Sequence, residues 1–547
     1  MNSPATTRAG RCEALQSRAF DLLVIGGGIT GCGIARDAAL RGLSVALVEK
    51  DDFASGTSSR SSRLIHGGVR YLEHGHLHLV FESSAERRLL LRLAGHLVRP
   101  LAFTWPVYDG ARIPRWKLGA GLMMYDALAL FRNVGRHRRL SRDAVLAHEP
   151  MLRRDGLRGG AKYYDAATND ARLTLANAIG ATEFGAVVVN HAAVTGLLFE
   201  NGRVAGAQVR DSLTGQGVDV RAAVVVNATG PWTDNVRRFD SVTSAGHTPA
   251  TPAMRGSKGA HIAVPRDRLG NRDALTLTSP RDGRVMFVLP AESQAIVGTT
   301  DTYTPSLPDD VRATNDDVRY LLDSANAFFP SAGLTTEDVV SAWAGIRPLL
   351  PNAADSPGAV SREHAITTSG NGLVSITGGK LTTYRVMAAG VVDVVVTALG
   401  RRSGASQTRS RPLPGGDFLS LDSLIVTGTQ NTSDPALARH LVWSHGNRWP
   451  YVWEEMLRGD GRVPIHDGLP YTLGELRYSA QHEMAYTLGD LLVRRTHLAF
   501  ETRDHGAAAA ERVADGLSAT FGWDANARRR EIDAYLAEVE RIFGGRS

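Results

Sequence analysis

The chain has 547 residues, of which 43% are hydrophobic, and a formal net charge of +6 at pH 7. At about 150 residues per domain, this length predicts two to four domains with a sizeable core. The positive balance favours an anionic partner, such as nucleic acid, anionic lipid or a phosphorylated small molecule. Because the basic residues form no single tract with interleaved aromatic residues, we expect no nucleic-acid binding.

Cysteine usage and hydropathy exclude several classes of protein. The two cysteines, Cys12 and Cys32, belong to no metal-ligand pattern, so we expect neither a metal site nor a disulfide, as in a reducing compartment. Residues 1–19 lack the apolar core of a signal peptide and predict a flexible leader. No stretch offers eighteen or more uninterrupted apolar residues, so we expect no membrane span.

The first recognisable unit lies between residues 21 and 49. An apolar run at residues 21–25 predicts a buried parallel strand that leads into a glycine turn with Gly26, Gly28 and Gly31. Gly26 permits the tight turn, Gly28 lets the backbone approach a pyrophosphate, and Gly31 lets the next helix pack on the strand. Glu49 ends the following strand, at the spacing where an acid meets an adenosine ribose hydroxyl. The unit predicts dinucleotide binding, and its acid disfavours a 2′-phosphate.

Two segments with less regular patterns come next. Residues 57–72 are rich in hydroxyls and glycines, so we expect this loop to wrap a cofactor's phosphates rather than to be a polar surface loop. After a predicted helix at 77–97, an apolar stretch at 118–131 is flanked by Arg115, Trp116, Lys117 and the basic run 136–139. Such a short helix is typical of an anionic lipid surface. A buried helix with basic ends is an equal alternative.

The second half of the chain alternates between two predicted sheets. Residues 187–226 predict short strands that return to the nucleotide-binding sheet. Strands at 261–264, 274–277, 285–289 and 295–298 predict an inserted, mostly antiparallel sheet. The strand 373–376 precedes a second glycine-rich turn, at residues 378–384, whose helix N-terminus suits an anion. After the linker at 412–416 the chain predicts a separate helical domain, with an amphipathic helix at 531–543.

Seven motifs together resemble one family, the FAD-dependent (aerobic, quinone-linked) glycerol-3-phosphate dehydrogenases, over roughly residues 20–500. They are residues 26–31, 61–72, 227–232, 298–301, 345–349, 378–385 and 490–496. The resemblance implies an α/β fold with a discontinuous Rossmann-like FAD-binding domain of the glutathione-reductase type at 20–410. A substrate cap would occupy about 80–180 and 231–345, and an all-helical C-terminal domain would occupy 411–547.

The resemblance also implies an activity. FAD would oxidise sn-glycerol 3-phosphate to dihydroxyacetone phosphate by hydride transfer from C2 to flavin N5, and the electrons would pass to a membrane quinone. The large insertion of some oxygen-using oxidases is absent, which favours quinone. The protein would be a homodimer, located in the cytoplasm and peripherally associated with the inner face of the cell membrane.

Candidate substrate residues follow from the same resemblance. A leaving hydride needs a group that takes the hydroxyl proton and fixed positive charge for the phosphate. The cationic candidates are Arg70, Arg347, Arg362 and Lys380. We expect Arg347 and Arg362 to grip the phosphate, and Arg70 and Lys380 to lie nearer the flavin and the reacting oxygen. His261 is the candidate proton acceptor. Surface ion pairs, or a core histidine, are the alternative roles.

Candidate cofactor residues are divided by the part of FAD they would meet. Gly26, Gly28, Gly31 and Glu49 would serve the adenosine diphosphate, and Val194 the adenine through its backbone. The phosphates or the ring would meet Thr57, Ser58 and Ser62, and His66 is a candidate for covalent attachment of FAD, as histidine is in some flavoenzymes. The ribityl and isoalloxazine portions would meet Gly230, Gly379, Lys380, Leu381 and Thr382. The sequence departs from the family pattern at Arg63, where lysine is usual, and at Asn169, where a second acid is usual.

Two other functions remain open. An amine or amino-acid oxidase can use the same kind of flavin fold, but it must hold a carboxylate and leave an amine uncharged. The cluster of arginines and a lysine favours a dianion instead. The second alternative is a flavin-binding module without catalysis, whose C-terminal helices recruit a partner.

Overall fold

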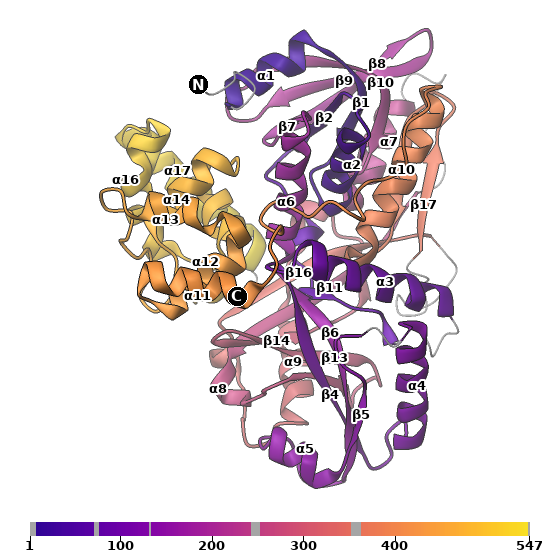
Figure 1. The fold of residues 1–547 in the computed structure, drawn as a ribbon, viewed down its shortest axis with the longest axis vertical. Coiled ribbons are helices and arrows are strands. Elements are labelled where there is room, and N and C mark those ends of the chain that lie inside the picture. The colour runs from indigo at the N-terminus through magenta and orange to yellow at the C-terminus, as the bar shows by residue number, and fades with distance from the viewer. Residues whose placement is uncertain (1–6, 70–75, 131–132, 242–251, 352–362, 545–547) are drawn as a thin grey trace.

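The computed structural model describes residues 7–69, 76–130, 133–241, 252–351 and 363–544. Two sheet-containing regions lie one above the other along the long axis, and a group of C-terminal helices lies beside their junction (Figure 1). The arrangement is the expected α/β fold with an inserted sheet and a helical C-terminal domain.

The upper sheet has the order β17-β18-β10-β1-β2-β7. Its central strand β1 is parallel to both β2 and β10 and almost wholly buried, which explains its unbroken apolar run. A hairpin of β8 and β9 extends β10. The strands are β1 (Ala19–Ile25), β2 (Val45–Val48), β7 (Val187–Val189), β8 (Ala192–Glu200), β9 (Arg203–Asp211), β10 (Gly217–Asn227), β17 (His364–Thr368) and β18 (Val374–Gly378).

Helices α2 (Ile29–Leu40), α6 (Asp170–Glu183) and α10 (Tyr384–Ala398) pack together with this sheet. The predicted cap boundary placed α6 in the cap, but α6 packs on α2 of the nucleotide-binding domain. Helix α7 (Thr233–Ser241) contacts β8. These helices bury the apolar face of the sheet and leave the C-terminal ends of its strands facing the second sheet (Figure 1).

The lower sheet is mostly antiparallel, with one parallel pair between β4 and β12. Its strands are β3 (Leu64–Ile65), β4 (Val98–Tyr108), β5 (Arg138–Leu140), β6 (Leu157–Thr168), β11 (Arg255–Pro265), β12 (Ala274–Thr278), β13 (Val285–Ala291), β14 (Gln294–Gly298), β15 (Thr302–Tyr303) and β16 (Ser341–Leu349). The flanking helices are α3 (Leu77–Leu93), α4 (Arg115–Leu128), α5 (Arg142–His148), α8 (Arg266–Leu269) and α9 (Asn315–Asn326).

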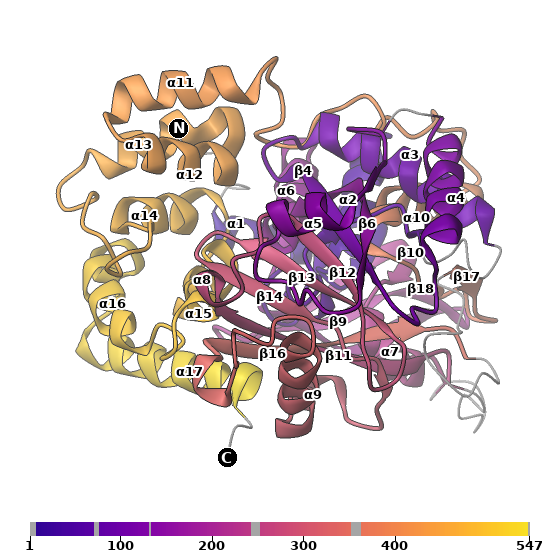
Figure 2. The same cartoon turned by 90° about the horizontal axis from the view of Figure 1, so that it is seen from below.

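The C-terminal domain is helical and packs against both regions (Figure 2). Its helices are α11 (Leu421–Thr432), α12 (Pro435–His445), α13 (Trp449–Met456), α14 (Leu473–His482), α15 (Leu498–Glu501), α16 (Ala507–Phe521) and α17 (Ala525–Phe543), with a π-helical turn, η10 (Asp490–Arg495). Its buried residues continue the core of the lower sheet, because Phe500 packs edge-on against Trp343 of β16.

The expectation of a flexible leader is wrong for residues 8–17, which form α1 (Arg8–Ser17). Thr7 caps this helix by accepting a hydrogen bond from Gly10 N, and Leu15 is buried. Arg8 forms an ion pair with Asp211 over 2.8 Å. An isolated ten-residue helix is marginal in water, so these contacts with the upper sheet stabilise it.

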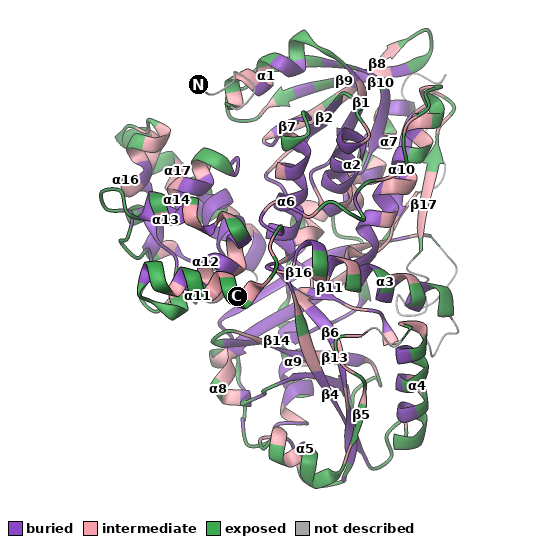
Figure 3. Ribbon diagram, viewed as in Figure 1, coloured by how far each residue is buried: buried purple, intermediate pink, exposed green. Residues whose placement is uncertain are grey.

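Among the described residues, one helical stretch, Leu381–Ala398, is long and apolar enough to cross a membrane. Half of it is buried, because α10 packs against α2 and the upper sheet. Figure 3 shows this helix with a buried inner face. Its apolar composition is therefore explained by its place in the core.

A substitution at Gly31 tests whether α2 needs to pack closely on the glycine turn. A Cβ at Gly31 would overlap the carbonyl oxygen of Gly26, whereas a Cβ at Gly121 in α4 meets no atom within 4 Å. We expect Gly31→Ala to lower the free energy of unfolding by about 1–3 kcal/mol or more through overpacking. Gly121→Ala, the matched control, should leave it unchanged or raise it by up to about 1 kcal/mol. Urea unfolding measures both changes, and equal stabilities of the two variants would contradict this account.

Candidate active site

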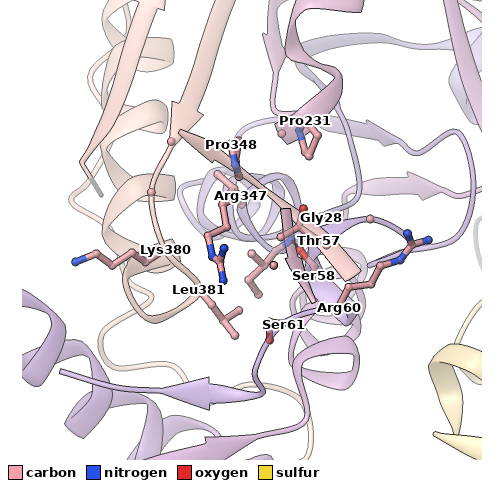
Figure 4. Close-up of a pocket in the computed structure, with 18 of the residues that line it drawn as sticks. Gly28, Thr57, Ser58, Arg60, Ser61, Pro231, Arg347, Pro348, Lys380 and Leu381 are labelled. Carbon is pink, nitrogen blue, oxygen red and sulfur yellow. Dashed lines mark hydrogen bonds between the residues drawn. The ribbon is translucent and has the colours of Figure 1, made fainter. Parts of the chain in front are cut away.

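Both sheets contribute to one cavity of about 560 Å³. Its walls include four segments: the glycine turn after β1, the loop after β2, the end of β16, and the turn between β18 and α10. The turn after β10 and residues of β11 line it as well. Figure 4 shows residues of these four segments around a common space. The two predicted glycine-rich turns therefore meet at the same site, where the strands of the upper sheet end.

The glycine turn brings the backbone close to the N-terminus of α2. Gly26 has a φ of 110°, and a Cβ there would lie 2.7 Å from the carbonyl oxygen of Ala228. Gly28 precedes the first residue of α2, and Ile29 N donates a hydrogen bond to Ser58 Oγ over 3.0 Å. The Ser58 hydroxyl thus lies beside the positive end of the helix dipole, where an anion such as a pyrophosphate binds.

Glu49 lies at the predicted adenosine end of the cavity. Its carboxylate accepts hydrogen bonds from Gly27 N over 2.6 Å and from Asp51 N over 3.0 Å. Burial, followed by the nearby charge of Asp51, raises the pKa of Glu49 to about 7. The carboxylate is therefore poised to gain from a hydroxyl donor, as a ribose would supply.

The remaining predicted cofactor residues divide into two groups. The cavity is lined by Thr57, Ser62, His66, Val194, Gly230, Gly379, Lys380 and Leu381. Thr382 and Gly31 do not line it. Thr382 Oγ1 accepts a hydrogen bond from His66 N over 3.2 Å and donates to His66 O over 3.3 Å, so it fixes the backbone beside the cavity.

His261 lies on β11 opposite Trp343 of β16 and stacks on the indole, with 5.4 Å between ring centroids. A Cβ at Gly298 would overlap the imidazole, so that glycine leaves the space for it. The side chain is 2% exposed, and its Nε2 lies 2.8 Å from Ser62 Oγ. Burial first, and the cation of Arg347 next, lower the pKa of His261 to about 3. The ring is therefore neutral at neutral pH, and a pKa this low makes it a weak proton acceptor without substrate.

Arg347 lies on β16, next to β11, and other residues of the lower region hold its side chain in place. Its guanidinium donates to Asp301 over 3.0 Å and to Thr299 Oγ1 over 2.9 Å. A Cβ at Gly259, on the neighbouring strand, would overlap the guanidinium. The side chain is 24% exposed and lines the cavity. This arrangement provides a fixed positive charge with the planar donors that suit a phosphate.

The other predicted cations are placed differently. Lys380 lines the same cavity, but its side chain extends away from Arg347 in Figure 4. Arg70 and Arg362 lie outside the described residues. The described structure therefore brings Arg347 and His261 together from adjacent strands and places Lys380 on a separate wall.

Several cavity residues were missed by sequence reasoning. Asp301 and Thr299 hold Arg347, and they belong to the motif at 298–301, which was noted without a role for either residue. Arg284 donates to the Asp301 backbone oxygen over 2.9 Å and also lines the cavity. It stands in a turn before β13 with no local motif, so no sequence signal could have found it.

The walls fit FAD. A dinucleotide requires close backbone approach at the pyrophosphate, which Gly26 and Gly28 permit, and an acceptor for the ribose, which Glu49 supplies. The cavity continues from that end to His261 and Arg347, so a flavin held at the far end would lie near both side chains. Residues of the upper sheet therefore line the end of the cavity that suits a dinucleotide, and residues of the lower sheet line the end with His261 and Arg347.

Comparison with known proteins agrees with this geometry. Residues 21–385 match the FAD dependent oxidoreductase family, and residues 406–528 match the C-terminal domain of alpha-glycerophosphate oxidase. Over 542 residues the chain is 40% identical to glycerol-3-phosphate dehydrogenase 2 of Mycobacterium tuberculosis, covering 97% of this chain and 90% of that one. The chain belongs to the glycerol-3-phosphate dehydrogenase family.

Other members of the glycerol-3-phosphate dehydrogenase family extend this result. The aerobic glycerol-3-phosphate dehydrogenase of Bacillus subtilis is 35% identical over 535 residues, which cover 95% of this chain and 94% of that one. A solved glycerol-3-phosphate dehydrogenase from Bacillus halodurans, complexed with FAD, is 33% identical with a TM-score of 0.81 and covers 98% of each chain. The expected fold and FAD cofactor are confirmed, and the likeness extends beyond residue 500.

The two departures from the family pattern have structural roles. Arg63 lies over the rings of Trp343 and Phe500, at 5.6 Å and 5.0 Å from their centroids. Asn169 caps α6 by accepting a hydrogen bond from Arg172 N over 3.0 Å. The neighbouring Asp170 accepts a hydrogen bond from Ser61 Oγ over 2.6 Å, so the start of α6 fixes the loop that leads to Ser62.

Glu49 predicts a pH dependence of FAD affinity. A ribose hydroxyl that donates to the carboxylate stabilises its ionised form, and the pKa of Glu49 without ligand is about 7. FAD should therefore bind more weakly as the pH falls below 7, by up to about tenfold per pH unit. Titration of the apoprotein with FAD, followed by flavin fluorescence, measures this change. Glu49→Gln should remove the dependence, and the same slope in that variant would contradict the assignment.

Proposed function

We propose that this chain oxidises sn-glycerol 3-phosphate to dihydroxyacetone phosphate and reduces its FAD. The observation that carries the proposal is the pairing of a fixed guanidinium, Arg347, with a neutral imidazole, His261, at one end of the cavity. The substrate phosphate is a dianion that needs such a cation, and its C2 hydroxyl must lose a proton. The names of relatives 35–40% identical to this chain support the same substrate.

The residues have distinct parts in the proposed reaction. FAD, when bound, would supply the two-electron acceptor for the hydride that leaves C2. Arg347 binds the phosphate and fixes the position of C2. His261 takes the hydroxyl proton. The phosphate dianion offsets the charge of Arg347, so substrate binding raises the pKa of His261 and makes it a better proton acceptor.

Anaerobic addition of glycerol 3-phosphate to the FAD-loaded protein should bleach the visible flavin band.

Arg347→Lys keeps the charge but loses the planar donors, so we expect kcat/KM to fall about ten- to hundredfold. His261→Ala should lower kcat by about a hundredfold or more, because it removes the proton acceptor. Arg281→Lys, on an exposed turn outside the cavity, is the matched control for the arginine.

A flavin that glycerol 3-phosphate leaves unbleached, but that small amino acids bleach, would favour the amine or amino-acid oxidase alternative. A flavin that no substrate reduces would favour the non-catalytic module. Unchanged turnover and pH profile in His261→Ala would remove that residue from the mechanism.

We also propose that electrons leave the reduced flavin for a membrane quinone and that the protein binds the cytoplasmic face of the membrane as a homodimer. Support for the membrane surface comes from α4, which buries Leu122 and Tyr125 but exposes Trp116, Met123 and Met124. Its basic flanks are exposed as well. The one acid of α4, Asp126, is buried and accepts a hydrogen bond from His137 N. An exposed apolar helix with basic ends and no exposed acid suits anionic lipid.

Helix α4 lies on the side of the molecule opposite the C-terminal helices in both views (Figures 1 and 2). A membrane on that side would leave the C-terminal domain free of lipid. For the acceptor, anaerobic reoxidation of the reduced flavin by a soluble quinone should be faster than reoxidation by oxygen in buffer, and the reverse order would favour an oxidase.

Flotation with anionic liposomes tests the lipid surface. Simultaneous replacement of the basic residues around α4 by glutamine should reduce flotation and make the remaining flotation less sensitive to salt, because each exposed cation near an anionic surface contributes about 1 kcal/mol of attraction that salt screens. The replaced residues are Arg115, Lys117, Arg136, Arg138 and Arg139. A control variant replaces five exposed arginines of the C-terminal domain: Arg439, Arg462, Arg512, Arg529 and Arg530. Unchanged flotation of the first variant would exclude α4 as the lipid-binding surface.

A further inference from the structure

We propose that the C-terminal helical domain positions the adenosine end of the FAD site, through one buried carboxylate, Asp52, that lies outside the cavity. Asp52 belongs to the turn after β2, three residues beyond Glu49. Glu49 and Lys50 of this turn line the cavity, whereas Asp52 is fully buried behind it. Asp52 is therefore a positioning residue, which acts through the turn and not by touching the cofactor.

The turn is bound to the glycine loop that receives the cofactor. Ala54 N donates to Gly27 O over 3.1 Å, and Gly27 N donates to the Glu49 carboxylate. Phe53 packs closely on Gly27: a Cβ added at Gly27 would lie 2.8 Å from the Phe53 ring. A displacement of the turn therefore moves both the ribose acceptor and the glycine loop.

Four hydrogen bonds hold the Asp52 carboxylate, and three of them come from the C-terminal domain. Arg495 donates to both carboxylate oxygens, over 2.7 Å and 3.0 Å, in a bidentate pair. Arg494 Nε donates over 2.7 Å, and Asn190 Nδ2 supplies the fourth bond over 2.9 Å. Bidentate guanidinium contacts fix the orientation of a carboxylate as well as its position.

The two arginines are themselves anchored within the C-terminal domain. Both lie in the π-helical turn η10, a rare element that often occurs at functional sites. Arg494 also binds Asp490 over 3.1 Å and Glu538 of α17 over 2.6 Å. Arg495 Nε donates to Glu483 O over 3.1 Å. The position of η10 is thus fixed by contacts with two further segments of the helical domain, at Glu483 and at Glu538.

The C-terminal domain also contacts the chain at the start of β8, which lies beside the Asp52 turn. His191 Nε2 lies 2.9 Å from Asp490, and His191 N donates to Asp51 O over 2.7 Å. Ala192 N donates to Glu49 O over 2.7 Å, and Ala192 lines the cavity. The turn and the strand next to it are therefore held by one set of contacts from η10.

A metal ion is the other use that a cluster of Asp52, His191 and Asp490 suggests, since their ligand atoms lie within 4.8 Å of one another. Arg494 and Arg495 donate to these carboxylates and already supply the positive charge. A cation would have to displace both guanidinium groups from a buried site, which favours the positioning role.

The test measures FAD binding to the full chain, independently of catalysis. Arg495→Lys keeps the charge but loses the bidentate contact, so we expect the dissociation constant of FAD, from titration of the apoprotein, to rise about tenfold, or about 1.4 kcal/mol. At saturating FAD, the flavin spectrum and the KM for glycerol 3-phosphate should match the wild type, because the flavin end of the cavity is untouched. Asp52→Asn, which keeps the shape of the side chain, should raise the constant in the same way.

Arg503→Lys is the matched control. Arg503 also joins the C-terminal domain to the rest of the chain, but it donates to Glu337 O over 2.6 Å in the lower region, away from the adenosine turn. This variant should leave the dissociation constant of FAD unchanged. The proposal is overturned if Arg495→Lys and Asp52→Asn both bind FAD within twofold of the wild type, or if Arg503→Lys weakens FAD binding as much as they do.

Discussion

The site depends on one antiparallel strand pair, β11 with β16, that carries large polar side chains within a buried sheet. In this pairing His261 faces Trp343, and Gly259 faces Gly345 two residues away. The glycines at 259 and 298 leave the volume that Arg347 and His261 occupy. Without that volume neither side chain would fit against the sheet, because protein interiors are close-packed. The two functional side chains can therefore lie against the sheet only because glycines stand beside them on neighbouring strands.

The electrostatics of the cavity follow from burial. The pKa of His261 is lowered and that of Glu49 is raised, so each group is displaced toward its neutral form for the same first reason, loss of water. Arg347 is charged, as a guanidinium always is in proteins, and it donates a hydrogen bond to Asp301. A dinucleotide and a phosphorylated alcohol supply what these groups lack, namely hydroxyl donors for the acid and negative charge beside the arginine and the imidazole.

Much of this arrangement could be predicted because it is encoded locally. The run from Gly26 to Glu49 specifies strand, turn, helix and strand within one segment, and the structure has these elements in that order. The strands of the inserted sheet were predicted by their short apolar runs. The role of Thr382 could not be predicted, since its hydroxyl binds His66, 316 residues away. The leader was judged by its polar composition, whereas Arg8 and Leu15 find partners on the upper sheet only in the folded chain.

The order of strands in the upper sheet constrains how the protein is made. The first strand, β1, pairs with β10, and β10 pairs with β18, so the sheet is complete only after residue 378 has left the ribosome. Asp52 meets its arginine partners later still, because Arg494 follows it by 442 residues. Until then the apolar strands and the Asp52 carboxylate of the nascent chain lack their partners, and such a partly folded state is prone to aggregation. The complete set of contacts around the adenosine end of the cavity is consequently available only after nearly the whole chain has been synthesised.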